Sequence, residues 1–240
     1  MCGFTRRVTL NRRRALLLGG VAAVGLAASR TIGVASTPAR AHSQDRLSPQ
    51  QALQRLIDGN NRFSMDAAPQ ADISTARRAE LTGGQQPFAA LVSCADSRVP
   101  PEIIFDQGLG DLFVCRIAGN IVDAGIAGSI EYAVGVLGVS LVFVLGHEEC
   151  GAVKAAVAAT ESDSSISPNI DVLVNAIRPA VERVRSQSGN LLDNAIRENI
   201  RLGVQSLHAE PDLQPFVQSG AIEIVGGEYN LSSGIVELIQ

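Results

Sequence analysis

Two short runs, residues 94–98 and 147–150, contain the side chains best suited to chemistry in this sequence. The first run reads Cys-Ala-Asp-Ser-Arg and the second reads His-Glu-Glu-Cys. Two thiolates and one imidazole are ligands that Zn²⁺ prefers, and a three-ligand site leaves a fourth position for water or substrate. Structural zinc sites are usually closed by four Cys or His side chains. Three ligands beside Asp96 and Arg98 therefore predict a catalytic site.

The runs must be brought together by the secondary structure around them. Apolar runs predict strands at residues 88–93, 112–117, 140–145, 221–225 and 234–238, with a turn at 226–230. Helical spacing and capping residues predict helices at 48–60, 75–81, 125–137, from 150 onward, and at 170–186, 191–207 and 213–218. This alternation is typical of an α/β fold with a mostly parallel β-sheet flanked by helices.

Parallel sheets gather ligands at the carboxyl ends of their strands. Cys94 directly follows the first predicted strand, and His147 follows the third. Cys150 lies three residues beyond His147, where a turn into a helix can bring both side chains to one ion. We therefore expect the three side chains to converge.

Composition limits the classes of function. The 240 residues are 46% hydrophobic and 18% charged, which suits one globular α/β domain. Residues 1–41 contain seven arginines and no acid. The remainder has 13 basic and 24 acidic side chains, a formal charge of −11. Binding to the phosphates of a nucleic acid needs a positive net charge, so nucleic-acid binding is not expected.

Residues 1–41 predict a cleaved export signal, which leaves residues 42–240 as a single zinc domain. Arg12 and Arg13 precede an apolar run at 16–28, and Ala39-Arg40-Ala41 offers a small-x-small cleavage pattern. The pair resembles a twin-arginine signal, so the twin-arginine export machinery is an expected partner. The 13-residue run is shorter than the roughly 20 residues that span a bilayer, so no stable membrane span is expected in the mature form. We expect an exported protein, in a periplasm or a thylakoid-like lumen.

Other interpretations of the cysteines and acids remain open. A disulfide between Cys94 and Cys150 is the alternative to a metal site, since an oxidising compartment favours it. The mature chain would hold three cysteines, and an odd number argues against a disulfide framework. Cys115 lies in an apolar run and is expected to be a small core residue. Glu148 and Glu149 are expected to be solvated or orienting residues.

The sequence resembles the plant-like branch of the β-class carbonic anhydrases from about residue 47 to its end. Beyond the two runs, the resemblance rests on segments that occur in order: Ser97-Arg98-Val99-Pro100, Arg116-x-Ala118-Gly119-Asn120, Gly128-x-Ile130-Glu131-Tyr132-Ala133 and Gly146-His147. It implies one Zn²⁺ per subunit, held by Cys94, His147 and Cys150. It also implies a catalytic dyad of Asp96 and Arg98, with Asp96 becoming a fourth metal ligand in a closed state.

The same resemblance implies reversible hydration of carbon dioxide to bicarbonate and a proton, by attack of zinc-bound hydroxide. The implied substrate-binding residues are Gln85, Phe113, Tyr132 and Gly151. It further implies a homodimer or higher oligomer, with an N-terminal helical arm at residues 48–63 that packs on a partner subunit. The noncatalytic bicarbonate site of the other branch uses a Trp, and this sequence has none.

Two rival functions fit parts of the pattern. A carbonyl sulfide or carbon disulfide hydrolase would share the motifs, and only an assay of sulfide release separates it. A noncatalytic zinc-binding protein is the other rival, but it has no physical need for an intact pair of Asp96 and Arg98.

Overall fold

The computed structural model describes residues 46–68, 71–161 and 167–239. The predicted export signal at residues 1–41 lies outside them and stays a prediction. No helix within the described residues is long and apolar enough to cross a membrane.

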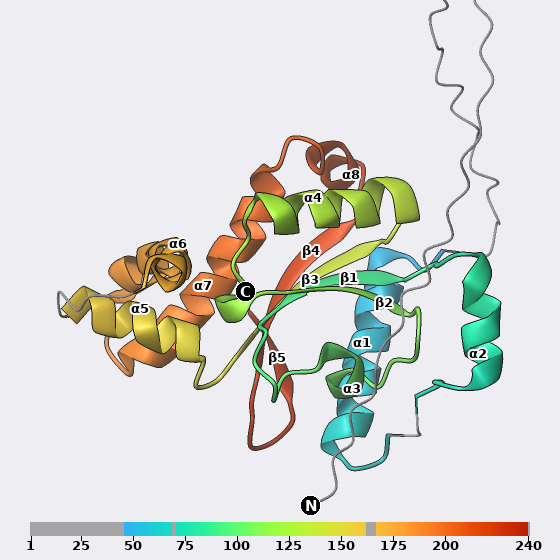
Figure 1. The fold of residues 1–240 in the computed structure, drawn as a ribbon, viewed down its shortest axis with the longest axis horizontal. Coiled ribbons are helices and arrows are strands. Elements are labelled where there is room, and N and C mark those ends of the chain that lie inside the picture. The colour runs from blue at the N-terminus through green and yellow to red at the C-terminus, as the bar shows by residue number, and fades with distance from the viewer. Residues whose placement is uncertain (1–45, 69–70, 162–166, 240) are drawn as a thin grey trace, which may run out of the picture. The chain divides into compact units, whose positions relative to one another are not determined.

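A five-stranded sheet lies at the centre of the fold, in the order β2-β1-β3-β4-β5 (Figure 1). The first four strands in this order are parallel, and the edge strand β5 is antiparallel to β4. β1 and β3 are buried along their entire length because helices cover both faces of the sheet. The predicted mostly parallel sheet is confirmed. The strands are β1 (Ala89–Ser93), β2 (Leu112–Arg116), β3 (Leu141–His147), β4 (Glu223–Tyr229) and β5 (Val236–Ile239).

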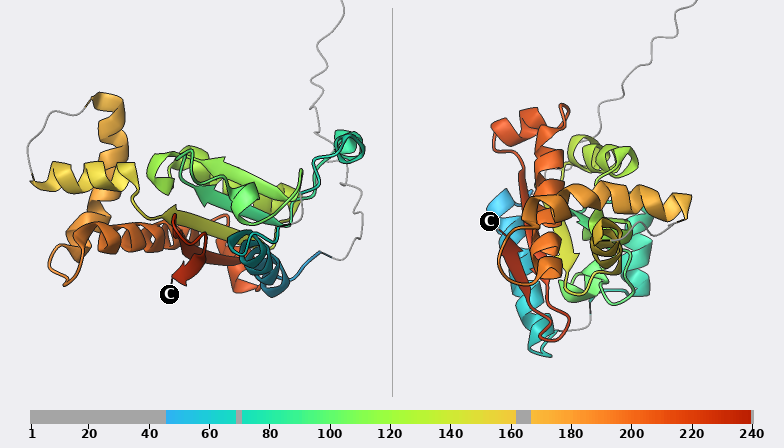
Figure 2. Two further views of the ribbon diagram at one scale, coloured as in Figure 1. Left: turned by 90° about the horizontal axis from the view of Figure 1, so that it is seen from below. Right: turned by 90° about the vertical axis from the view of Figure 1, so that its left-hand side faces the viewer.

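Helices form a layer on each face of the sheet. α1 and α3 cover one face, and α4 and α7 cover the other. α5 and α6 project beyond the carboxyl ends of the strands, as Figure 2 shows from two further sides. The helices are α1 (Pro49–Ser64), α2 (Thr75–Glu80), α3 (Pro101–Ile104), α4 (Ala124–Tyr132), α5 (Gly151–Glu161), α6 (Pro168–Val184), α7 (Leu191–Ala209) and α8 (Gln214–Gln218). Shorter helical turns are η1 (Leu81–Gly83), η2 (Ala118–Asn120) and the π-helical η3 (Ala133–Leu137).

The first helix, α1, packs against its own chain. Its start is fixed by a capping box, in which Ser48 Oγ accepts from the Gln51 amide at 3.2 Å and the Gln51 side chain accepts from the Ser48 amide at 2.8 Å. Ala52 and Leu56 are fully buried against the sheet. Packing of this helix on a partner subunit stays a prediction.

Asn60 near the end of α1 fixes the connection between β4 and β5. Its Nδ2 donates to the Gly234 carbonyl at 2.8 Å, and its Oδ1 accepts from the Val236 amide at 2.8 Å. Nδ2 also donates to the Ile104 carbonyl at 3.2 Å. Asn60 is 3% exposed, so these bonds satisfy a buried amide.

The predicted turn at residues 226–230 is wrong, because β4 continues through it to Tyr229. A Cβ on Gly226 would lie 2.5 Å from Ile200 Cγ2, and one on Gly227 would lie 2.6 Å from Phe143 Cζ. These glycines therefore let a helix and a ring approach the strand closely. The reversal follows β4, where the Asn230 amide donates to the Ile235 carbonyl at 2.8 Å.

Candidate metal centre

Three buried side chains converge at the carboxyl edge of the sheet. Cys94 directly follows β1, His147 is the last residue of β3, and Cys150 precedes α5. One ligand atom from each lies within 4.8 Å of the other two. The parallel neighbours β1 and β3 end at this edge together, which confirms the expected convergence.

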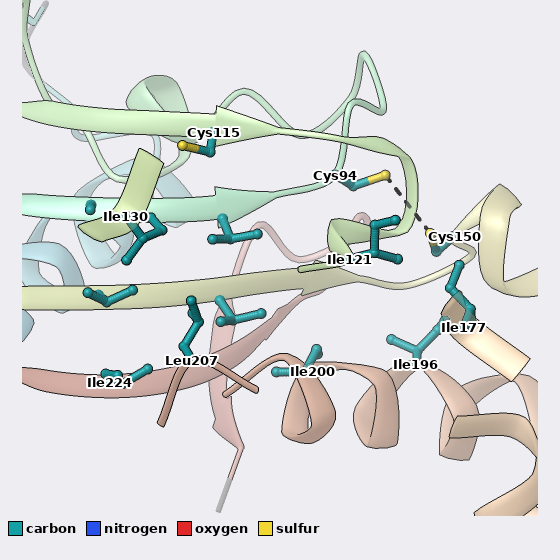
Figure 3. Close-up of a cluster of buried hydrophobic side chains, with 14 of the residues drawn as sticks. Cys94, Cys115, Ile121, Ile130, Cys150, Ile177, Ile196, Ile200, Leu207 and Ile224 are labelled. Atoms are coloured by element: carbon teal, nitrogen blue, oxygen red, sulfur yellow. Dashed lines mark hydrogen bonds between the residues drawn. The ribbon is translucent and has the colours of Figure 1, made fainter. Parts of the chain in front are cut away.

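The two sulfurs are placed for a shared metal ion and not for a disulfide. Cys94 Sγ and Cys150 Sγ are 4.0 Å apart, and both cysteines are free (Figure 3). A disulfide would hold its sulfurs about 2.05 Å apart. Two sulfurs at about 2.3 Å from a tetrahedral zinc would lie about 3.8 Å apart. Cys115 lies back along β2, away from this pair, and is buried as predicted.

His147 presents one ring nitrogen to the centre. Its Nδ1 lies 2.7 Å from the backbone oxygen of Glu148, and a carbonyl can only accept, so Nδ1 carries the proton. Nε2 then holds a lone pair, and it is buried without a hydrogen-bond partner. A buried nitrogen with no partner is costly unless something occupies its lone pair. A metal ion between Nε2 and the two sulfurs would do so.

The two thiols lie close enough that the charge on one affects the protonation of the other. The pKa of Cys94 is lowered, chiefly because the Cys150 thiol donates to its sulfur, with a smaller contribution from the Gly119 amide, which donates at 3.3 Å. The pKa of Cys150 is raised, because losing its proton would give up that bond and place a second buried negative charge beside the first. A divalent cation would relieve that repulsion, so the donor set fits a metal better than it fits two free thiols.

Asp96 is held beside the cluster by Arg98. Arg98 donates from Nε to Asp96 Oδ1 at 2.9 Å and from Nη2 to Oδ2 at 2.8 Å. The Arg98 amide also donates to Oδ1 at 2.9 Å. This bidentate contact keeps the pKa of Asp96 well below its usual range. Oδ2 lies only 3.9 Å from His147 Nε2, so the carboxylate borders the metal position while its bonds tie it to Arg98.

Arg116 fixes the backbone that carries these residues. Its Nε donates to the Cys94 carbonyl at 2.9 Å, and its Nη2 donates to the Asp96 carbonyl at 2.5 Å. The side chain comes from the end of β2, next to β1 in the sheet. The sequence motif includes Arg116, but only the structure assigns it this role.

The two acids between the ligands are orienting and solvated residues, as predicted. The Glu148 carboxylate accepts from the Leu231 amide at 3.1 Å and from Asn230 Nδ2. It thereby ties the His147 loop to the connection after β4. Glu149 is exposed and paired with Lys154.

Residues 89–236 match the family model described as carbonic anhydrase. A Mycobacterium tuberculosis protein named carbonic anhydrase 2 is 40% identical over 187 residues, which cover 78% of this chain and 90% of that protein. The chain belongs to the carbonic anhydrase family. A carbonic anhydrase of Pseudomonas aeruginosa is 31% identical over 195 residues, covering 78% of this chain and 87% of that protein.

Solved structures place the fold in the β class of carbonic anhydrases. The β-carbonic anhydrase CcaA superposes with a TM-score of 0.63 at 28% identity, covering 78% of this chain and 95% of that one. A β-carbonic anhydrase from Sordaria macrospora, described as tetrameric, gives a TM-score of 0.63 at 23% identity, covering 78% and 96%. At this lower identity the second likeness concerns the fold alone.

Of the substrate-binding residues that the carbonic anhydrase resemblance implies, only Gly151 adjoins the cluster within one chain. It is the first residue of α5, directly after Cys150. It is exposed, and a Cβ there would meet nothing within 4 Å. Its position therefore leaves room for a small molecule at the start of the helix.

The other three residues lie toward the opposite end of the strands. Phe113 pairs in register with Ala90, four residues before Cys94, which is about 13 Å along the strand. The Phe113 and Tyr132 rings lie together, with centroids 6.2 Å apart, and Tyr132 is 45% exposed. Gln85 is exposed and precedes the amino end of β1. One subunit does not bring these three side chains to its own metal cluster.

Proposed function

We propose that this protein catalyses reversible hydration of carbon dioxide to bicarbonate and a proton, with one zinc ion per subunit. The observation that carries the proposal is the buried set of Cys94, His147 and Cys150, with Asp96 held beside it by Arg98. Zinc held by this set would supply a hydroxide nucleophile, because zinc lowers the pKa of coordinated water; the value of about 7 is that of carbonic anhydrases whose zinc has three His ligands.

The protein's own groups then have separate roles. Asp96 Oδ2, on the side facing His147 Nε2, can accept a hydrogen bond from the attacking water and direct its lone pair at carbon dioxide. Arg98 keeps that carboxylate ionised and turned to its own guanidinium. Burial of the three ligands excludes bulk water from their side of the site, which strengthens these interactions.

Rapid mixing of the protein with carbon dioxide tests the proposal. We expect fast acidification, loss of that activity after a zinc chelator removes the metal, and recovery on adding zinc. The same samples should be tested for sulfide release from carbonyl sulfide and carbon disulfide. A zinc-loaded protein that releases sulfide and leaves carbon dioxide untouched would replace the proposed substrate, and activity in neither assay would support a noncatalytic role.

We infer further that a second copy of the chain completes the substrate pocket with Gln85, Phe113 and Tyr132. These residues lie too far from the cluster of their own chain, and Phe113 belongs to the edge strand β2. An exposed strand edge and an exposed aromatic side chain are both suited to contact with another subunit. This arrangement fits the plant-like branch and a homo-oligomer.

Mixing two inactive variants tests the shared pocket. C150S lacks a metal ligand but keeps the pocket residues, and F113A/Y132A has the reverse defect. When the two are unfolded and refolded together, we expect about a quarter of wild-type activity, because half of the random dimers contain one complete site of two. Each variant refolded alone is the control. A mixture no more active than its components would place the pocket within one subunit.

We also propose that the protein is exported by the twin-arginine route to a periplasm or a thylakoid-like lumen. The support is the pair Arg12 and Arg13 ahead of a short apolar run. A mature protein that starts at His42 outside the cytoplasm is the expected finding, and retention of full-length protein in the cytoplasm would contradict it.

A further inference from the structure

A buried amide, Asn199, lies on the apolar face of α7. It is 6% exposed, next to Ile196 and Ile200 in the hydrophobic core. Its Nδ2 donates to the backbone carbonyl of Gly119 at 2.8 Å, across 80 residues of sequence. Burying an amide among aliphatic side chains is costly unless the amide is hydrogen-bonded. The bond to Gly119 therefore offsets the cost of placing Asn199 in the core.

Gly119 is hydrogen-bonded directly to one of the proposed metal ligands. Its own amide donates to Cys94 Sγ at 3.3 Å. Gly119 has a φ of 74°, and a Cβ there would lie 2.6 Å from Ile177 Cδ1. Asn120 follows with a φ of 44°, so two successive residues occupy the left-handed region. Such a backbone persists only where its surroundings hold it, and Asn199 is one of the groups that do.

We propose that Asn199 is a positioning residue of the metal centre: it holds Gly119 in the conformation that aims its amide at the Cys94 thiolate. An amide that donates to a ligating sulfur fixes the direction of the thiolate and withdraws charge from it. This role rests on the proposed function only in that Cys94 ligates the metal. The hydrogen bond of Asn199 reaches Gly119, and Gly119 in turn reaches the ligand Cys94.

Asn60 provides a matched control. It is as deeply buried, at 3% exposed, and it also donates to backbone carbonyls. It lies in α1, on the opposite face of the sheet from α7. N60A therefore removes a comparable buried amide without touching Gly119.

The experiment compares N199A, N199S and N60A with the wild type. The zinc dissociation constant is measured by competition with a chromophoric chelator, and the thiolate-to-metal charge-transfer band by cobalt substitution. We expect both Asn199 variants to bind zinc about 10–100-fold more weakly and to shift the cobalt band. N60A should lower the melting temperature while leaving both metal readouts at wild-type values. N199S keeps a polar side chain and serves if N199A fails to fold.

A wild-type zinc constant and cobalt band in whichever Asn199 variant folds would overturn the proposal. Equal changes in N60A would also overturn it, because they would reflect general destabilisation. A wild-type protein that binds no zinc would overturn the proposed function together with this role. Zinc binding by the wild type with unchanged Asn199 variants would overturn this role alone.

Discussion

Replacing Cys150 with serine is expected to remove most of the bound zinc and with it the hydration of carbon dioxide. A hydroxyl is a much poorer ligand for zinc than a thiolate, and the cluster has only three ligands to begin with. Because the side chain is 1% exposed, no solvent-exposed group can easily take its place. Zinc content by atomic spectroscopy and turnover by stopped-flow mixing measure the two effects.

C115S is the matched control for that substitution. Cys115 is also buried, but it lies on the edge strand β2, outside the metal cluster. Burial raises the pKa of its thiol, as expected of a core residue. C115S should keep full zinc occupancy. Full occupancy in C150S, or equal loss in both variants, would show that the ligand assignment is wrong.

Replacing Arg98 with alanine should lower turnover about 10–100-fold while zinc content stays at the wild-type level. Without the guanidinium, Asp96 loses both side-chain hydrogen bonds that hold it. Its Oδ2 is 3.9 Å from His147 Nε2, close enough to turn onto the metal and occupy the fourth position. The measurement is the turnover number with zinc quantified in the same sample.

R98K separates the charge of Arg98 from its shape. Lysine keeps the positive charge but cannot form the planar two-point contact with a carboxylate. We expect its turnover to fall between those of the wild type and R98A. Wild-type turnover in R98A would remove Arg98 from the mechanism, and loss of zinc in R98A would show that it acts by holding the ligands together.

The metal cluster could be predicted because short stretches of sequence around each ligand indicate where that ligand lies in the sheet. Cys94 and His147 each follow an apolar run that is typical of a buried strand, and neighbouring parallel strands end at the same edge. The Asp96–Arg98 pair spans only two residues, so its contact follows from proximity in sequence. For these residues, strand periodicity and spacing carried enough information.

Other features depend on contacts that no local pattern encodes. Gly226 and Gly227 resemble a turn in sequence. In the structure they lie within β4, where the absence of a side chain makes room for Ile200 and Phe143 to pack onto the strand. Asn199 could have been noticed as a polar residue on an apolar helical face, but its partner Gly119 lies 80 residues away. The short helix α3 also went unpredicted.

The segment between β4 and β5 is held by hydrogen bonds from two separate parts of the chain. Asn60 of α1 binds Gly234 and Val236, and the Glu148 carboxylate binds Asn230 and the Leu231 amide. Glu148 in turn supplies the carbonyl that orients the imidazole. Trimming the amino terminus past α1, or fusing a bulky tag that displaces it, would therefore release Gly234 and Val236 in this segment, while the Glu148 carboxylate still holds Asn230 and Leu231 beside the histidine.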